Sequence, residues 1–213
     1  GSVALVGTYQ NDYYGSAYIY RYNGTTWVEE QNLLGDAESR LFGCSVAIRG
    51  DVALVGAYNT FDDNRISTGA AYVFRYNGTT WVEEMKLLAS DGAANDFFGR
   101  SVAISGNVAL VGASEYDDDG SNNGSAYIYR YNGTTWVEEQ KLLASDGAVN
   151  DRFGHSVAFS GDVALVGAYR DDNDNGGNSG SAYVYRYNGT TWVEEQKLLA
   201  SDGAASDYFG MAV

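Results

Sequence analysis

Short apolar segments alternate with polar turns along the whole chain, and this pattern repeats four times. The ten-residue string RYNGTTWVEE occurs almost unchanged in every copy, beginning at Arg21, Arg75, Arg130 and Arg186. The tryptophans of these strings are 54, 55 and 56 residues apart. Self-similarity at a fixed period is typical of stacked supersecondary units, each of which buries its apolar face against its neighbours.

Each repeat contains four segments that predict β-strands. In the second copy they are SVAIRG, VALVGA, AYVFRY and TWVEEMKL, which are rich in β-branched and aromatic residues and lack a helical period. A Gly-Asp or Gly-Asn turn joins the first two segments. An Asn-Gly turn, which tolerates positive φ at both central positions, joins the last two. Because the first two strands are apolar on both faces and the last carries a Glu pair, the repeat predicts a β-propeller blade with its inner strands packed between neighbours.

The repeats predict a single all-β domain over residues 1–213, a β-propeller of four-stranded antiparallel blades. We place the repeats at about 1–41, 42–97, 98–152 and 153–208, so that 209–213 would complete the first blade. Pairing of residues 211–213 with residues 3–6 would close the ring and hide the sheet edges. The alternative is that the four blades belong to a larger ring or to a fibre.

Phe-Gly pairs begin the first strands, at Phe42, Phe98, Phe153 and Phe209. The repeat reads FG-x-SVAISG-x-VALVGA, then a polar Asp/Asn/Gly loop, then SGSAYVYRY. It resembles the FG-GAP repeat, which builds the ligand-binding β-propeller of integrin α chains and occurs in bacterial surface and secreted proteins. The resemblance covers essentially the whole chain. It implies an extracellular or cell-surface protein that acts in adhesion or recognition.

Two departures from the family pattern change what the resemblance implies. The chain contains no proline, so the third residue of Gly-Ala-Pro is replaced in every copy. Integrin-type repeats also hold calcium in a D-x-D-x-D-G loop between the first and second strands, where this chain has only a two-residue turn. The calcium loop of the family therefore has no counterpart at that turn.

Acidic residues gather instead between the second and third strands of the last two repeats. Asp171, Asn173 and Asn175 follow the pattern D-x-[DN]-x-[DN]-G, and Asp117 and Asp119 nearly follow it. Alternating oxygen ligands before a Gly turn can wrap a hard cation, so these five residues are candidate calcium ligands. An alanine holds the position of a closing bidentate Glu, and a plain solvated turn is the alternative.

The loops after the second strand differ most between repeats, at residues 9–15, 58–69, 114–124 and 169–180. All four are expected at one rim of the propeller. Their aromatic and short polar side chains suit contacts with protein or glycan, because aromatic faces stack and short polar groups hydrogen-bond. The candidate binding residues are Tyr13, Tyr14, Phe61, Asp62, Tyr116, Tyr169 and Arg170.

Five Asn-Gly-Thr or Asn-Gly-Ser sequences are formal N-glycosylation acceptors. The asparagines are Asn23, Asn77, Asn123, Asn132 and Asn188. Four of them coincide with the predicted hairpin turn, where turn chemistry alone explains Asn-Gly. Modification would require export from a host with the machinery, and would then give a regular glycan array on one rim.

Composition and charge narrow the range of partners. Of the 213 residues 45% are hydrophobic and 14% aromatic, which is ample for a folded core. The formal net charge of −15 repels phosphate backbones and anionic lipid headgroups, so we expect neither nucleic acid binding nor membrane insertion. The single cysteine, Cys44, excludes an intrachain disulfide.

The chain carries little that is typical of an enzyme. His155 is the only histidine, without a nucleophile elbow, and no Walker loop, HExxH or CxxC sequence occurs. Neighbouring glutamates on a strand point to opposite faces and cannot act as a catalytic pair. The third position of FG-x-S is Cys44, Arg100, His155 or Met211. In a closed propeller these side chains would lie at one end, or mouth, of the central channel. Because an arginine among them repels a cation, we expect them to pack there rather than to form a soft-metal site.

Three non-enzymatic functions fit these features. The first is an extracellular adhesion or recognition propeller that binds protein or glycan through the variable loops at one rim. The second is a structural subunit of a surface or extracellular filament, with or without glycans, that self-associates through edge strands. The third is a lectin with one sugar site per blade, which would require similar loops in all blades.

Overall fold

The computed structural model describes residues 2–9, 14–61, 66–115 and 123–213, and within these residues the secondary structure is all β. The strands are β1 (Val3–Thr8), β2 (Ser16–Tyr22), β3 (Trp27–Leu33), β4 (Val46–Arg49), β5 (Val52–Ala57), β6 (Ala70–Tyr76), β7 (Trp81–Leu87), β8 (Phe98–Ser105), β9 (Val108–Ala113), β10 (Ser125–Tyr131), β11 (Trp136–Leu142), β12 (Phe153–Ser160), β13 (Val163–Ala168), β14 (Ser181–Tyr187) and β15 (Trp192–Leu198).

Each sheet corresponds to one repeat, and its strands follow chain order. One three-stranded sheet, β1-β2-β3, is followed by the four-stranded sheets β4 to β7, β8 to β11 and β12 to β15. All pairings between the strands are antiparallel. The predicted fold class, an all-β array of antiparallel propeller blades, is therefore confirmed.

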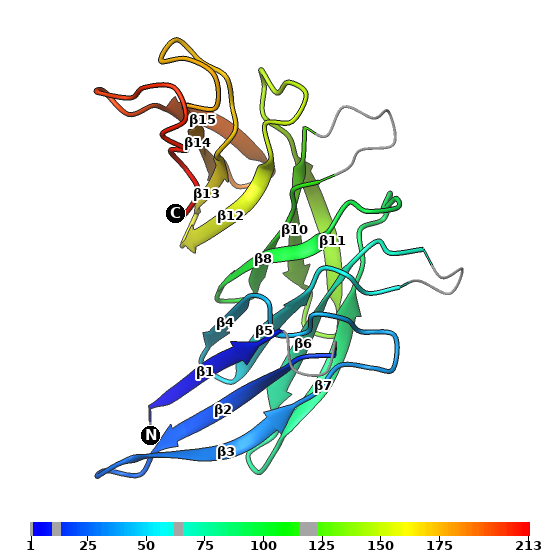
Figure 1. Cartoon of the computed structure of the whole chain (residues 1–213). Helices are drawn as coiled ribbons and strands as arrows, with labels where there is room; N and C mark the ends of the chain where they lie inside the picture. Colours follow the sequence, from blue (N-terminus) through cyan, green and yellow to red (C-terminus); the bar gives the residue numbers. More distant parts are fainter. Residues whose placement is uncertain (1, 10–13, 62–65, 116–122) are drawn as a thin grey trace.

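The four blades do not form a closed ring in this structure. Among the described residues β1 pairs only with β2, and its Val6 is 52% exposed. Phe209 bridges Gly180, and no residue after it belongs to a strand. Figure 1 shows the sheets in a curved row with the two chain ends apart. The expected pairing of residues 211–213 with residues 3–6 is not formed, and ring closure stays a prediction.

The Asn-Gly hairpins differ from the expected two-residue turn. In the first, four residues separate the paired Tyr22 and Trp27. Only the glycine of the turn has positive φ, between 98° and 100° in the four copies. The Asn23 Oδ1 accepts hydrogen bonds from the backbone N–H groups of Thr25 and Thr26, both at 2.9 Å. The asparagine thus closes the turn through its side chain, which makes positive φ at this residue unnecessary.

The phenylalanine of each internal Phe-Gly pair is buried between two blades. Phe42 is 0% exposed and meets Tyr72 and Phe74 edge to face, with centroids 5.4 and 6.1 Å apart. It also forms a β-bridge with Gly15 of the preceding blade. Phe98 and Phe153 repeat this arrangement. As a result, three hydrophobic clusters form, and each joins residues of two neighbouring sheets.

Glycine backbones meet where neighbouring blades approach most closely. A Cβ placed on Gly112 in β9 would lie 2.0 Å from the carbonyl oxygen of Gly154, in the next Phe-Gly pair. Gly154 has φ +86°, and a Cβ there would lie 2.1 Å from the carbonyl oxygen of Ser125. The other two blade junctions repeat the first contact, at Gly7 with Gly43 and Gly56 with Gly99, and Gly167 makes it with Gly210 of the C-terminal segment. Both glycines of the motif are needed because the two backbones pack directly together.

Substitution of Gly112 tests this contact. Gly112→Ala is expected to lower the free energy of unfolding by about 3 kcal/mol or more, because the backbones of two blades must separate. Gly106→Ala is the control, since Gly106 has φ +61° but no atom within 4 Å of an added Cβ. It should cost about 1 kcal/mol from backbone strain alone. Urea denaturation measures both, and equal losses would contradict the packing argument.

Candidate functional site

An ion pair between neighbouring blades recurs on the outer strands. Each lysine ammonium lies 2.7 to 2.8 Å from an aspartate oxygen of the preceding blade and 5.3 to 5.6 Å from the ring centroid of a tyrosine in its own blade. Burial alone would raise the pKa of these aspartates, but the lysine hydrogen bonds leave the pKa below its ordinary value. The pairs are Lys86 with Asp36, Lys141 with Asp91, and Lys197 with Asp146.

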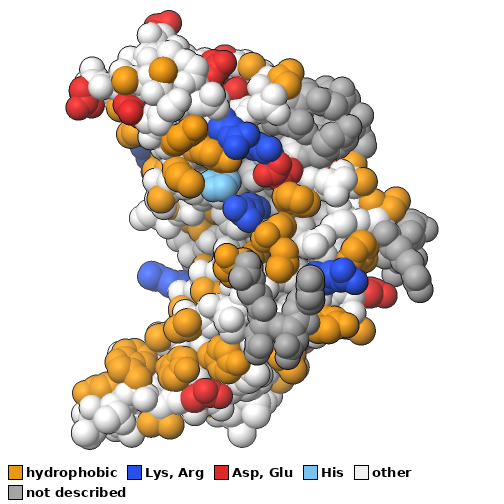
Figure 2. Space-filling view, viewed as in Figure 1, with side chains coloured by type: hydrophobic (Ala, Val, Ile, Leu, Met, Phe, Trp, Pro, Cys, Tyr) orange, Lys and Arg blue, Asp and Glu red, His pale blue; other side chains and the backbone are white. Residues whose placement is uncertain are grey.

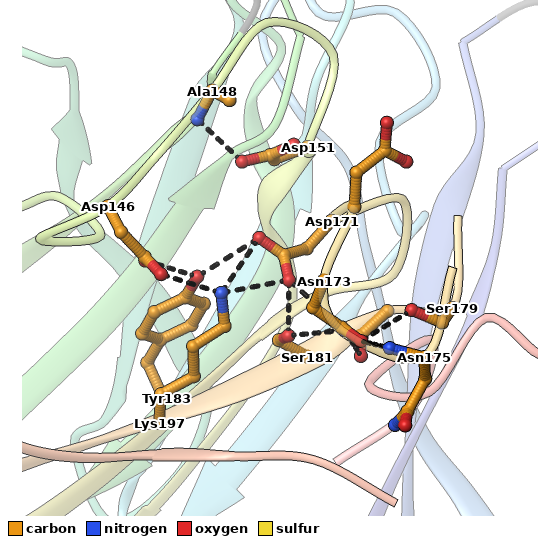
Figure 3. A network of polar contacts seen from close by, with 12 residues as sticks. Asp146, Ala148, Asp151, Asp171, Asn173, Asn175, Ser179, Ser181, Tyr183 and Lys197 are labelled. Atoms are coloured by element: carbon orange, nitrogen blue, oxygen red, sulfur yellow. Dashed lines mark hydrogen bonds and ion pairs between the residues drawn. The ribbon is translucent and has the colours of Figure 1, made fainter. Parts of the chain in front are cut away.

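The fourth blade adds a second, buried carboxylate to this ion pair. Asp171 is only 2% exposed, and Figure 3 shows its side chain directed toward Lys197. The Lys197 Nζ lies 3.1 Å from Oδ1 and 2.9 Å from Oδ2. The hydroxyls of Ser181 and Tyr183 donate to Oδ2 at 2.5 Å and to Oδ1 at 3.3 Å. The charge of Asp171, the first expected calcium ligand, is therefore already compensated by an ammonium group.

Asn173 and Asn175 hold the loop through their own hydrogen bonds. The Asn173 Nδ2 donates to the carbonyl of Gly180 at 2.9 Å, and its Oδ1 accepts from Asn175 N at 2.9 Å and from Ser179 Oγ at 2.7 Å. The Asn175 Nδ2 donates to the carbonyl of Ala200 at 2.9 Å. The three expected ligands thus lie in one network (Figure 3), and the side-chain oxygens of Asp171 and Asn173 are engaged within the protein.

This donor set does not fit calcium while Lys197 occupies it. A hard cation requires several free oxygen ligands, and an ammonium at the same carboxylate would repel it. Within the described ranges, no group of three or more His, Cys, Asp or Glu side chains is arranged to hold a metal. Asp117 and Asp119 lie outside the described residues. Calcium binding at either loop stays a prediction.

A basic cluster, Arg100, Arg152, His155 and Arg170, lies at the rim where the variable loops emerge. Arg100 and His155 occupy the third position of FG-x-S, at the start of β8 and β12. Arg152 directly precedes β12, and Arg170 follows β13 after one residue. Figure 2 shows the single histidine of the chain with basic side chains on two sides. The structure therefore joins a predicted binding residue, Arg170, to positions predicted to pack at a channel mouth.

Aromatic rings support the cluster. The Arg100 guanidinium lies 4.8 Å from the ring centroid of Tyr58, and the Arg170 guanidinium lies 5.4 Å from that of Tyr169. The His155 and Tyr169 ring centroids are 4.4 Å apart. Tyr169, which was predicted to contact a ligand, thus also fixes the two basic groups beside it.

Like charges lie close together in the cluster and lower the pKa values of His155 and Arg152. Burial and the charges of Arg100, Arg152 and Arg170 lower the pKa of His155 to about 4, so the imidazole is neutral at pH 7. Burial also lowers the pKa of Arg152, and Arg170 and Arg100 add to the effect. Glu115 forms an ion pair with Arg152. His155 Nδ1 is buried, with no hydrogen-bond partner among the described residues.

The remaining predicted loop residues are spread along the rim. Tyr14 is 56% exposed and borders a hollow of about 240 Å³ that is also lined by Leu34 and Asp36. The Phe61 ring lies under the guanidinium of Arg40, at 4.9 Å. Tyr13, Asp62 and Tyr116 lie outside the described residues.

The other two FG-x-S positions do not join a metal site with His155. Cys44 donates from Sγ to the Gly99 carbonyl at 3.3 Å, and burial raises the pKa of its thiol to about 11. Met211 is 56% exposed near the chain end.

Four of the glycosylation candidates are accessible on the turns. Asn23, Asn77, Asn132 and Asn188 are all exposed. Asn123 is half-buried, and its carbonyl accepts the Phe153 N–H at 2.9 Å. Modification at all five positions stays a prediction.

The sequence interpretation missed Lys197, Arg152 and Glu115. A signal for Lys197 was present, because a lysine recurs at this strand position in three repeats, each following an aspartate in the preceding repeat. Arg152 and Glu115 stand in segments that differ between repeats, so the pattern gave no indication of their pairing.

The fold defines a repeat protein built of β-propeller blades, and its variable side chains lie at one rim. The FG-GAP repeat matches residues 27–74, 81–129, 136–185 and 192–213. The chain belongs to the FG-GAP repeat family, as its sequence motifs indicated. Within the described residues, no helix is long and apolar enough to cross a membrane.

Integrin α subunits are among the proteins that this chain resembles. It is 28% identical to integrin alpha-2 of Mus musculus over 177 residues, which cover 75% of this chain and 15% of that protein. It is 31% identical to integrin alpha-11 of Homo sapiens over 116 residues, which cover 50% of this chain and 9% of that protein. The chain therefore spans less than a fifth of either relative.

Removal of Lys197 tests the ion-pair interpretation of the fourth-blade loop. Lys197→Met is expected to cost about 3 kcal/mol of unfolding free energy, because it leaves Asp171 buried without a countercharge. Lys141→Met is the matched control, since Lys141 lies over an equivalent tyrosine but pairs only with the half-exposed Asp91. It should cost under about 1 kcal/mol. Urea denaturation at pH 7 measures both, and a similar loss in the two variants would contradict the role of Asp171.

Proposed function

We propose that this chain is a non-enzymatic, extracellular recognition module that binds a protein or glycan partner through the rim formed by its variable loops. The observation that carries the proposal is the division of the repeat into constant and variable parts. The contacts between blades are nearly identical at every junction. The loops after β1, β5, β9 and β13 differ in length and sequence.

The likeness to integrin α subunits and the surface chemistry support this proposal. A repeated scaffold with unequal loops at one edge can vary its specificity without changing its core. Tyr14 and Arg170 offer an exposed aromatic ring and a cation at that edge. The strong negative charge of the chain favours solubility and disfavours nucleic acid as the partner.

Binding assays with rim variants test the function. The labelled chain is incubated with immobilised extracellular matrix proteins, a glycan array and intact cells. We expect saturable binding to at least one of these, and about tenfold weaker binding for Tyr14→Ala or Arg170→Ala, as is typical of anchor residues. Arg49→Ala is the control, because Arg49 is exposed at the end of β4 that faces away from the loops. Unchanged affinity in the rim variants, or an equal loss of affinity in Arg49→Ala, would contradict the proposal.

A second candidate function, end-to-end self-assembly, is favoured by the open face of the first sheet. Trp27 is 50% exposed, whereas the equivalent Trp81, Trp136 and Trp192 are 3%, 2% and 4% exposed because the preceding blade covers them. A large exposed aromatic surface of this kind is typical of an interaction site.

The last sheet carries groups that match this face. Gln31 and Gln140 each exchange two hydrogen bonds, of 2.7 and 2.8 Å, with the main chain of the next tryptophan. Gln196 is the corresponding residue of the last sheet, and it is exposed. A second copy could therefore dock its Trp27 face on the sheet that carries Gln196.

Sedimentation velocity over a range of concentrations tests self-assembly. This candidate predicts species that grow with concentration and that disappear in Trp27→Ala. Val137→Ala serves as the control, because Val137 is 47% exposed on an internal sheet. A monomer at every concentration would rule this candidate out and would leave the recognition function untouched.

A further inference from the structure

We propose that Arg100, Arg152 and Arg170 form a binding site for a carboxylate group, supplied by an acidic side chain of a protein partner. This inference deepens the proposed recognition function, and it rests on that function only for the origin of the ligand. The site lies at the loop rim and joins three elements: the start of β8, the residue before β12 and the loop after β13.

The charge balance of the cluster differs from that of the four arginines in the RYNGTTWVEE strings. The arginine of every RYNGTTWVEE string pairs with a glutamate of its own blade. In the part of the chain that the structure describes, Arg100 and Arg170 form no ion pair, and Glu115 is the single carboxylate paired with Arg152. Among the described residues, the three cations thus share one paired carboxylate, in a chain of net charge −15. An added anion would find uncompensated positive charge here.

The geometry of the guanidinium groups suits a carboxylate. The guanidinium groups of Arg100 and Arg170 each lie over a tyrosine ring, 4.8 and 5.4 Å from the ring centroid. The N–H donors of a guanidinium lie in its plane and point away from its edge. Two parallel N–H groups match the two oxygens of a carboxylate.

Unsatisfied buried groups point to the same ligand. The Nε of Arg152 is buried, with no hydrogen-bond partner among the described residues. An unpaired buried donor on a charged group is costly, and an oxyanion between the guanidinium groups would satisfy it. The depressed pKa values of His155 and Arg152 agree with a cluster of cations that lacks a countercharge.

The surroundings favour a single carboxylate on a protein over other anions. A polyanion such as nucleic acid or a sulfated glycan would be repelled by the net charge of −15 on the chain, whereas one compact anion is attracted locally. A sugar acid carries the same group, but sugar rings bind through open aromatic faces. Tyr58 and Tyr169 already have guanidinium groups over their rings.

The single histidine makes a direct test possible. The pKa of His155 is followed by NMR through its imidazole resonances, together with the arginine Nε–H resonances. N-acetyl-aspartate amide is the probe, and N-acetyl-asparagine amide is the uncharged control of the same shape. We expect the aspartate probe to bind saturably and to raise the pKa of His155 from about 4 toward its ordinary value, because a bound anion offsets the three arginines. The asparagine probe should leave the pKa unchanged.

Variants locate the site and keep the test independent of folding. Arg170→Gln and Arg100→Gln are each expected to weaken binding of the aspartate probe about tenfold, because each removes a charge-assisted hydrogen bond. Arg49→Gln removes the same charge from the opposite rim and should bind the probe as the native chain does. Unchanged amide spectra away from the rim would verify that the variants are folded.

Three outcomes would overturn the proposal. The first is no saturable change at His155 with the aspartate probe, and the second is an equal change with the asparagine probe. The third is binding of glucuronate without binding of the aspartate probe, which would assign the site to an acidic glycan instead. If the rim variants weaken binding to whole partners but the aspartate probe does not bind, the recognition function is supported and only the carboxylate site is contradicted.

Discussion

The contact of two glycine backbones at each blade junction is the constraint on which the rest of the structure depends. Gly112 approaches the carbonyl of Gly154 so closely that even a methyl group would not fit, and the same contact occurs at the two other blade junctions and between Gly167 and Gly210 of the C-terminal segment. The close approach lets the phenylalanine beside the second glycine enter the core between two sheets. It also brings the outer strands near enough for the lysine–aspartate pairs that join successive blades. The glycine of each Gly-Ala element thus packs against the glycine of the next Phe-Gly element.

This constraint separates the parts of the repeat that can change from those that cannot. The strands and the junctions must stay the same, because neighbouring blades pack directly on one another. The loops after the second strands lie beyond the junction and are free to vary. In the third and fourth blades the varied positions bring together the basic cluster, which stands out in an acidic chain. In the fourth blade the varied positions also add Asp171 to the repeated ion pair (Figure 3). The loop whose sequence resembles a calcium loop thus supplies a carboxylate that pairs with Lys197.

The sequence allowed the fold to be predicted closely, because the repeated strands and turns are local features with strong patterns. It was less informative wherever a side chain acts on residues that are distant in the sequence. The spacing of Asp171, Asn173 and Asn175 resembles that of a cation loop, but the residue that decides their chemistry, Lys197, lies on a strand 26 positions away from Asp171. Arg100 and Arg170 are 70 positions apart in the sequence, and both act on the charge of His155 only because neighbouring blades stack. The turn asparagines were expected to adopt positive φ, whereas they act through their side chains, a choice that the Asn-Gly pair alone does not decide.

The proposed contact of this FG-GAP chain with its partner is the rim of variable loops, with its uncompensated arginines. The most direct measurement is a crystal structure of the chain soaked with a short peptide that contains aspartate. We expect a carboxylate bound between the guanidinium groups of Arg100 and Arg170, with its oxygens within hydrogen-bond distance of their N–H groups. A peptide bound at the Asn-Gly-Thr turns on the opposite rim, or a basic cluster that remains empty at saturating peptide, would contradict it.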